Sequence, residues 1–133
     1  GQYEQAIEDF DEAIRLNPQD ADAYYNRGDR YYQRGLAYYS TVQLEQAIED
    51  FSEVIRLNPQ DADVYYYSYY NRGLAYKLVG QYERAIKDFD EAIRLNPQDA
   101  KGYYVRGLAY EALGKTIEAD RDFAKAKELG YDP

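Results

Sequence analysis

The chain has 133 residues, of which 45% are apolar, enough for one compact domain or one short repeat array. Its 25 acidic and 16 basic residues give a net charge of −9, which disfavours nucleic acid as a partner because a polyanion needs a cationic surface. Its apolar runs are only a few residues long, which is too short to cross a membrane.

The first predicted element is a lone helix over residues 2–16, QYEQAIEDFDEAIRL. Arg15 in its last turn suits the helix dipole, and Pro18 ends it because the residue before a proline is pushed out of the α region. Its apolar residues recur at spacings of three and four, which places them on one helix face: Tyr3, Ala6, Ile7, Phe10, Ala13, Ile14 and Leu16.

Copies of this segment follow along the chain and predict a repeat array. The stretch YEQAIEDFDEAIRLNP returns as YERAIKDFDEAIRLNP and, more loosely, as LEQAIEDFSEVIRLNP, while RGLAY occurs three times, once after each copy. No segment alternates apolar and polar residues over the length of a strand. We therefore expect an all-α chain of about seven antiparallel helices: the lone helix, then hairpins near 22–57, 62–95 and 100–129.

The spacing between matching landmarks changes along the array. The distance from the proline of NPQD to the glycine of the next RGLAY is 10 residues in the last hairpin, 14 in the middle one and 17 in the first. We therefore predict insertions of about four and about seven residues, each in the first helix of its hairpin or in the turn before it.

Both insertions are close to whole helical turns. Four residues advance a helix by about 400° and seven by about 700°, so either can lengthen a helix while its apolar face stays in place. We accordingly predict long helices near 22–41 and 63–79. The alternative is a bulge or a break near Gly28, because Gly28 and Gly35 each cost a helix interior about 1 kcal/mol and Asp29 favours turns.

Catalysis is not expected, nor are cofactors or metal ions. The chain has no histidine and no cysteine, so it lacks an imidazole base, a thiolate nucleophile and the usual zinc ligands. Its acidic clusters fit solvated helix faces, and its glycines do not form a phosphate-binding loop. Because no signal or membrane segment precedes the repeats, a cytoplasmic location is expected.

One motif accompanies each predicted hairpin: Tyr-x2-Arg-Gly-x2-Tyr, then Ala-x3-Phe, then Pro. The middle copy is Tyr69-x2-Arg72-Gly73-x2-Tyr76, followed by Ala85-x3-Phe89 and Pro97. Similar copies begin at Tyr31 and Tyr103, and the last one lacks the proline. The pattern resembles the tetratricopeptide repeat, with Tyr in place of Trp and Arg in place of Leu. The resemblance implies a right-handed solenoid of helix hairpins.

The resemblance divides the chain into a half repeat at 1–18, which holds only a second helix, and three full repeats. These are 21–59 with about seven inserted residues, 62–97 with about four, and 100–133 with a C-terminal cap. In such arrays the small residues let helices approach closely while the large ones fill the spaces between them. The motif tyrosines are accordingly expected in the core: Tyr31, Tyr38, Tyr69, Tyr76, Tyr103 and Tyr110.

The resemblance also implies binding of a protein or peptide in a concave groove lined by the first helix of each repeat. The family's subset that grips a C-terminal carboxylate uses a Lys, Asn, Lys and Arg set, which this chain replaces with Tyr, Leu and Val, so that activity is not expected. The residues expected to face the groove are Tyr25, Asn26, Tyr32, Gln33, Tyr39, Tyr70, Asn71, Leu74, Lys77, Tyr104, Val105, Leu108 and Glu111.

A second hypothesis is a structural scaffold without a natural ligand, either engineered or derived from a consensus. The near-identical copies of IRLNPQDA are typical of consensus repeats, although recent duplication gives the same pattern. Three consecutive tyrosines, Tyr65, Tyr66 and Tyr67, belong to the four-residue insertion and would protrude from a lengthened helix. Such an aromatic patch would favour self-association into a homo-oligomer.

Overall fold

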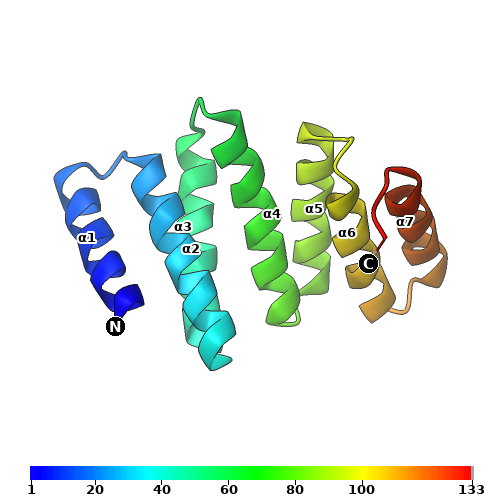
Figure 1. Ribbon diagram of the computed structural model, residues 1–133, viewed down its shortest axis with the longest axis horizontal. Coiled ribbons are helices and arrows are strands. Elements are labelled where there is room, and N and C mark those ends of the chain that lie inside the picture. Colours follow the sequence, from blue (N-terminus) through cyan, green and yellow to red (C-terminus); the bar gives the residue numbers. More distant parts are fainter. Residues whose placement is uncertain (133) are drawn as a thin grey trace.

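A computed structural model describes residues 1–132, and within this range the chain forms seven α-helices and no strand (Figure 1). The expected number and type of elements are confirmed. The helices are α1 (Gln2–Leu16), α2 (Ala21–Tyr38), α3 (Thr41–Leu57), α4 (Ala62–Leu78), α5 (Tyr82–Leu95), α6 (Ala100–Ala112) and α7 (Thr116–Glu128).

The helices stack side by side as antiparallel hairpins, α2 with α3, α4 with α5 and α6 with α7, while α1 packs on α2 (Figure 1). The first helices also touch across repeats, α2 with α4 and α4 with α6. Among the described residues, the second helices α1, α3, α5 and α7 make no such contacts with one another. The array therefore curves with its first helices on the concave side.

Each first helix begins at an aspartate that ends an NPQD loop. Asp20, Asp61 and Asp99 accept hydrogen bonds from backbone N–H groups in the first turns of α2, α4 and α6. Aspartate is a preferred N-cap because its carboxylate satisfies amides that have no partner inside the helix. No described helix is both long and apolar enough to span a bilayer.

The two helices of each hairpin approach closely where a glycine meets a phenylalanine. A Cβ atom added to Gly73 would lie 2.5 Å from the ring of Phe89, and one added to Gly107 would lie 2.6 Å from that of Phe123. Phe89 and Phe51 are fully buried. Glycine is required at these positions because any side chain would overlap the ring on the facing helix.

Beside each of these glycines an arginine forms a two-pronged ion pair with the second helix of the same hairpin. The guanidinium of Arg72 donates to Asp88 at 2.8 and 2.7 Å, and Arg106 donates to Asp122 at 2.8 and 2.7 Å. Burial raises the pKa of the Asp88 carboxyl, and the hydrogen bonds from Arg72 oppose that rise. Such a pair fixes the register of the hairpin, because removing one partner leaves a buried charge uncompensated.

The arginines also join neighbouring repeats. Arg72 donates to Ser52 on the preceding second helix at 3.1 Å, and Arg106 donates to Asp90 at 2.9 Å. Their guanidinium groups lie over tyrosine rings, with Arg72 5.6 Å from the ring centre of Tyr69. The substitution of Arg for Leu in the repeat motif thus ties three helices together.

In the first hairpin, this ion pair is formed by Arg27, and not by Arg34 of the motif copy that begins at Tyr31. Arg27 donates to Asp50 at 2.9 and 2.8 Å and to Asp11 at 2.8 Å. A Cβ atom on Gly28 would lie 3.0 Å from the ring of Phe51. Gly28 is therefore the counterpart of Gly73. The seven additional residues lie after Gly28, between this motif glycine and the motif alanine Ala47.

These seven residues lengthen the far end of the hairpin on both sides of the turn. From Gly28, α2 runs ten residues to Tyr38, whereas α4 runs five from Gly73 to Leu78. The turn is one residue shorter, and α3 begins three residues earlier relative to its motif alanine than α5 does. The insertion is helical as predicted, but its expected place, the first helix or the turn before it, is wrong in part because α3 is lengthened too. The helix α2 ends three residues before the expected position 41.

The tightened turn places a bulky residue in a strained conformation. Tyr39 has φ 50°, where the other two hairpins use Gly80 at 83° and Gly114 at 75°. A non-glycine residue in this left-handed region costs about 1–2 kcal/mol, because its Cβ crowds the following carbonyl oxygen.

The four-residue insertion lies at the opposite edge of the array, in the first turn of α4. This helix starts 11 residues before Gly73, whereas α6 starts seven before Gly107, and the helical prediction for residues 63–79 is confirmed. The additional turn is held by Tyr66, whose hydroxyl donates a hydrogen bond to Asp99, the N-cap of α6.

Replacing Gly73 by alanine is expected to lower the free energy of unfolding by about 2 kcal/mol, because the Phe89 ring must leave its packed position. Gly102→Ala is the matched control: its Cβ would meet a flexible Ile93 side chain at 3.1 Å, and the better helix propensity of alanine offsets that contact. Urea unfolding of both variants measures the difference. Equal losses would contradict the close approach at Gly73.

Candidate functional site

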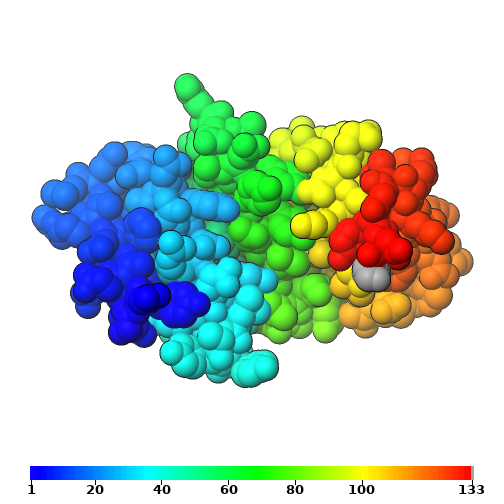
Figure 2. Space-filling model, in the orientation of Figure 1, coloured from blue at the N-terminus to red at the C-terminus, as the bar shows by residue number. Residues whose placement is uncertain are grey.

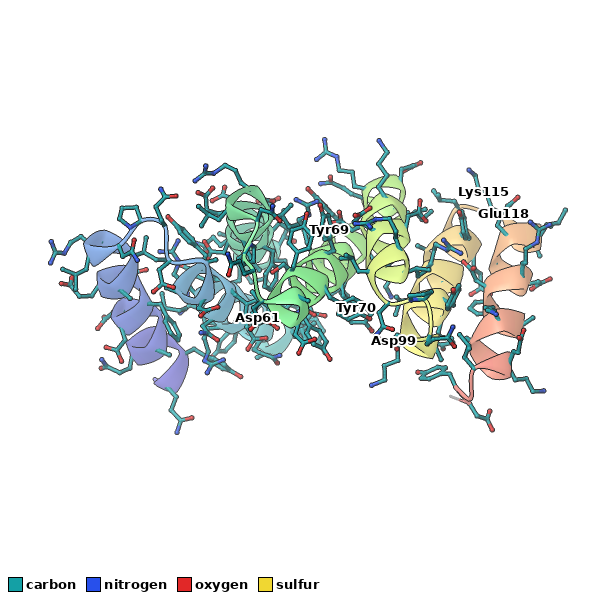
Figure 3. All side chains as sticks on the ribbon, turned by 90° about the horizontal axis from the view of Figure 1, so that it is seen from above. Asp61, Tyr69, Tyr70, Asp99, Lys115 and Glu118 are labelled. Atoms are coloured by element: carbon teal, nitrogen blue, oxygen red, sulfur yellow. The ribbon has the colours of Figure 1, made fainter. Side chains whose placement is uncertain are left out.

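The concave face carries a row of tyrosines, one from each first helix, three residues before the motif glycine. Each ring leans on the phenylalanine of its own hairpin, with centroid distances of 5.9 Å for Tyr25 on Phe51, 6.2 Å for Tyr70 on Phe89 and 5.7 Å for Tyr104 on Phe123. These tyrosines are half-buried. Each therefore packs on the core with one part of its ring and keeps another part exposed, although Tyr66 also contacts Tyr70 and Tyr131 also contacts Tyr104. Figure 3 shows Tyr69 and Tyr70 on opposite sides of α4.

A second row, one residue further along each helix, holds Asn26, Asn71 and Val105. Burial raises the pKa of the Tyr25 hydroxyl on α2, and the nearby Asn71 amide on α4 opposes that rise. Val105 is buried, with 8% of its surface exposed, and contributes only to the floor. Asn26 and Asn71 are partly exposed and retain amide groups that can pair with a peptide backbone.

The rows continue toward the far end of the hairpins. Leu74 and Leu108 occupy one position, whose counterpart in α2 is Asp29. Tyr32, Lys77 and Glu111 occupy the next one. The sequence prediction omitted Asp29 because its alignment was anchored at Gly35. The distance of ten residues that the first and last hairpins share, from Pro18 to Gly28 and from Pro97 to Gly107, is the signal that would have corrected it.

Gln33 and Tyr39 stand apart from these rows. Gln33 is exposed, and Tyr39 lies at the turn after α2 with 95% of its surface exposed. Tyr38, expected in the core, is also exposed, at 67%. These residues belong to the lengthened end of the hairpin, where Leu78 of the neighbouring repeat lies beside Tyr39.

The three consecutive tyrosines of α4 point in different directions. Tyr66 is buried, stacks on Tyr70 at a centroid distance of 6.1 Å and lies next to the Tyr67 ring at 5.0 Å. The Tyr65 hydroxyl lies 3.4 Å from that of Tyr69, and Tyr67 is 46% exposed. Of the three, Tyr65 and Tyr67 have surface left for a second molecule.

A cavity of about 360 Å³ lies at the C-terminal end of the groove. Tyr131 covers it from one side and lies 4.7 Å, centroid to centroid, from Tyr104. Its lining combines apolar and charged side chains: Tyr104, Leu108, Glu111, Phe123, Ala126, Lys127, Tyr131 and Asp132.

Burial is the main cause of the pKa shifts of Lys77 and Tyr70 in the groove. Burial lowers the pKa of Lys77, for which the described residues provide no ion-pair partner. Burial raises the pKa of Tyr70 to about 12. Within residues 1–132, no cluster of acidic side chains could hold a metal ion, and the groove offers stacking surfaces and hydrogen-bond donors.

Three family profiles match the chain. Residues 29–61 and 66–99 match one described as tetratricopeptide repeat, residues 89–121 match another of the same description, and residues 1–35 match one described as TPR repeat. The chain belongs to the tetratricopeptide repeat family. Repeats of this family are in general non-enzymatic protein-interaction modules. A search of curated protein sequences found no match.

Solved structures support the same assignment. A crystal structure of MamA is 31% identical with a TM-score of 0.82, over 97% of this chain and 64% of that one. MamA from Desulfovibrio magneticus RS-1 is 27% identical with a TM-score of 0.82, over 97% and 67%. The second TPR of Spaghetti (RPAP3), bound to the HSP90 peptide SRMEEVD, is 31% identical with a TM-score of 0.69, over 88% and 98%.

This TPR chain is expected to lose stability as the pH rises above about 10, the ordinary tyrosine pKa. Burial raises the pKa values of Tyr69 and Tyr70 to about 12, so the folded state holds these protons after the unfolded state has released them. The stabilisation is complete below pH ~10 and is lost between pH ~10 and ~12.

Urea unfolding midpoints at several pH values, followed together with tyrosinate absorbance, measure this loss. Tyr70→Phe removes one such group, and no hydrogen bond of the Tyr70 hydroxyl is found among the described residues. The variant should therefore lose less stability between pH ~10 and ~12 than the parent chain. A Tyr70→Phe curve parallel to that of the parent would contradict the shift at Tyr70.

Proposed function

We infer that the chain binds a protein partner as an extended segment along the concave face of α2, α4 and α6. The observation that carries this proposal is the row of Tyr25, Tyr70 and Tyr104. Each of these rings is braced from behind by a phenylalanine and is partly open in front. A rigid aromatic ring with a polar tip provides contact area at a low entropy cost.

Polar groups beside this row suit a peptide backbone. The side-chain amides of Asn26 and Asn71 can both donate to a carbonyl and accept from an N–H group. Lys77, half-buried on the same face, adds a donor for a backbone carbonyl or an acidic side chain. The groove thus combines apolar area with a small number of placed polar groups, as ligand sites generally do.

Charge narrows the class of partner. With a net charge of −9, the chain attracts basic segments over a long range and repels polyanions. A basic or neutral peptide rich in aromatic or aliphatic side chains fits this groove best. The peptide-bound RPAP3 structure supports this mode of binding for a related fold. The chain spans 64% of the MamA structure, so the partners of a longer protein are also matters of proposal.

A displayed library of random 12-residue peptides, selected on the immobilised chain, tests the groove. Tyr32→Ala and Asn71→Ala should each weaken a selected peptide about tenfold or more, as expected for central contact residues. Lys87→Ala is the control because Lys87 is exposed on the second helix α5. Peptides that bind all three variants equally, or a library that yields no binder, would refute groove binding and favour a scaffold without a ligand.

A further inference from the structure

The lengthened end of the first hairpin forms an apolar surface outside the groove. We define the hairpin tip as residues 35–44, which connect α2 to α3 and extend past the neighbouring repeats (Figure 2, cyan). Several of its apolar side chains are exposed: Leu36 at 40%, Tyr38 at 67%, Tyr39 at 95% and Val42 at 62%. Leu78 at the end of α4, 48% exposed, lies beside them.

We propose that the hairpin tip is a self-association surface through which two copies of this chain form a symmetric dimer. The tip would pair with the same tip of the second copy. This surface is separate from the tyrosines of the first turns of α4, which lie at the opposite edge of the array (Figure 1).

The distribution of charge supports a second copy as the occupant. Residues 35–44, GLAYYSTVQL, contain no charged side chain, although 31% of the whole chain is charged. Arg34, the residue just before the tip, already donates hydrogen bonds to Gln43 at 2.8 Å and to Glu4 at 3.3 Å. Two molecules of net charge −9 can therefore bring these tips together without placing like charges in contact.

The tip also has a projecting ring next to a cavity. The fully exposed ring of Tyr39 stands at the edge of a cavity of about 180 Å³ lined by Gly35, Leu36, Thr41, Leu44 and Leu78. A surface that pairs with itself across a two-fold axis needs a projecting and a receiving element side by side. The Tyr39 ring and this cavity supply them.

The available area sets the expected strength. The five exposed residues, two of them large aromatic side chains, offer roughly 600 Å² of accessible surface per copy. The total of roughly 1,200 Å² lies at the lower limit of specific interfaces. We therefore expect a reversible dimer with a dissociation constant in the micromolar range. Because the whole molecules repel each other, the dimer should tighten as salt rises.

Sedimentation velocity of the full chain between about 1 and 300 µM tests the dimer, at low and at physiological salt. Two variants remove the surface without disturbing the fold. Tyr39→Gly deletes the ring and relieves the positive φ, while Val42→Glu adds a charge in the first turn of α3, where a helix favours acids. Each should raise the dissociation constant at least tenfold.

Ile117→Glu is the matched control, because Ile117 is 71% exposed at the corresponding first-turn position of α7. This control should dimerise like the parent chain, and so should the groove variants Tyr32→Ala and Asn71→Ala. A parent chain that is monomeric throughout would overturn the proposal. So would dimerisation that survives both tip variants, or that Ile117→Glu abolishes equally. Thermal unfolding monitored by circular dichroism verifies that each variant is folded.

Discussion

The array depends on one repeated contact, in which a buried aspartate on each second helix receives an arginine from the first helix beside a glycine–phenylalanine close approach. The aspartates Asp50, Asp88 and Asp122 are almost completely buried. Such a carboxylate is tolerable only when it is paired, so it admits one register of the facing helix. With the register fixed, each tyrosine of the row leans on the phenylalanine of this contact and turns its exposed part toward the groove.

Because this contact holds each hairpin near its middle, both ends can vary. The first hairpin is longer on the turn side of this contact, and α4 is longer on the N-terminal side of its own contact. Each extension keeps the helical period and leaves the stacked core in place. The two differ in outcome: the added turn of α4 is absorbed by the bond from Tyr66 to Asp99, whereas the hairpin tip remains uncovered.

The sequence predicted the helices and their type well, because apolar periodicity, capping aspartates and prolines are local signals. It misplaced the first-hairpin register because two overlapping motif copies, Tyr24-x2-Arg27-Gly28-x2-Tyr31 and Tyr31-x2-Arg34-Gly35-x2-Tyr38, share Tyr31. The structure distinguishes them by their distant partners: Arg27 meets the buried Asp50, while Arg34 meets Gln43 and the exposed Glu4. The same error moved Tyr38 into the expected core and left Asp29 out of the groove.

The most direct measurement compares Arg27→Ala with Arg34→Ala by urea unfolding at neutral pH. Arg27→Ala should lose about 3–5 kcal/mol of unfolding free energy because Asp50 is left buried without its counter-charge. Arg34→Ala should lose no more than about 1 kcal/mol, as for an exposed ion pair. A larger loss for Arg34→Ala, or equal losses, would contradict the claim that the arginine–aspartate contact sets the register.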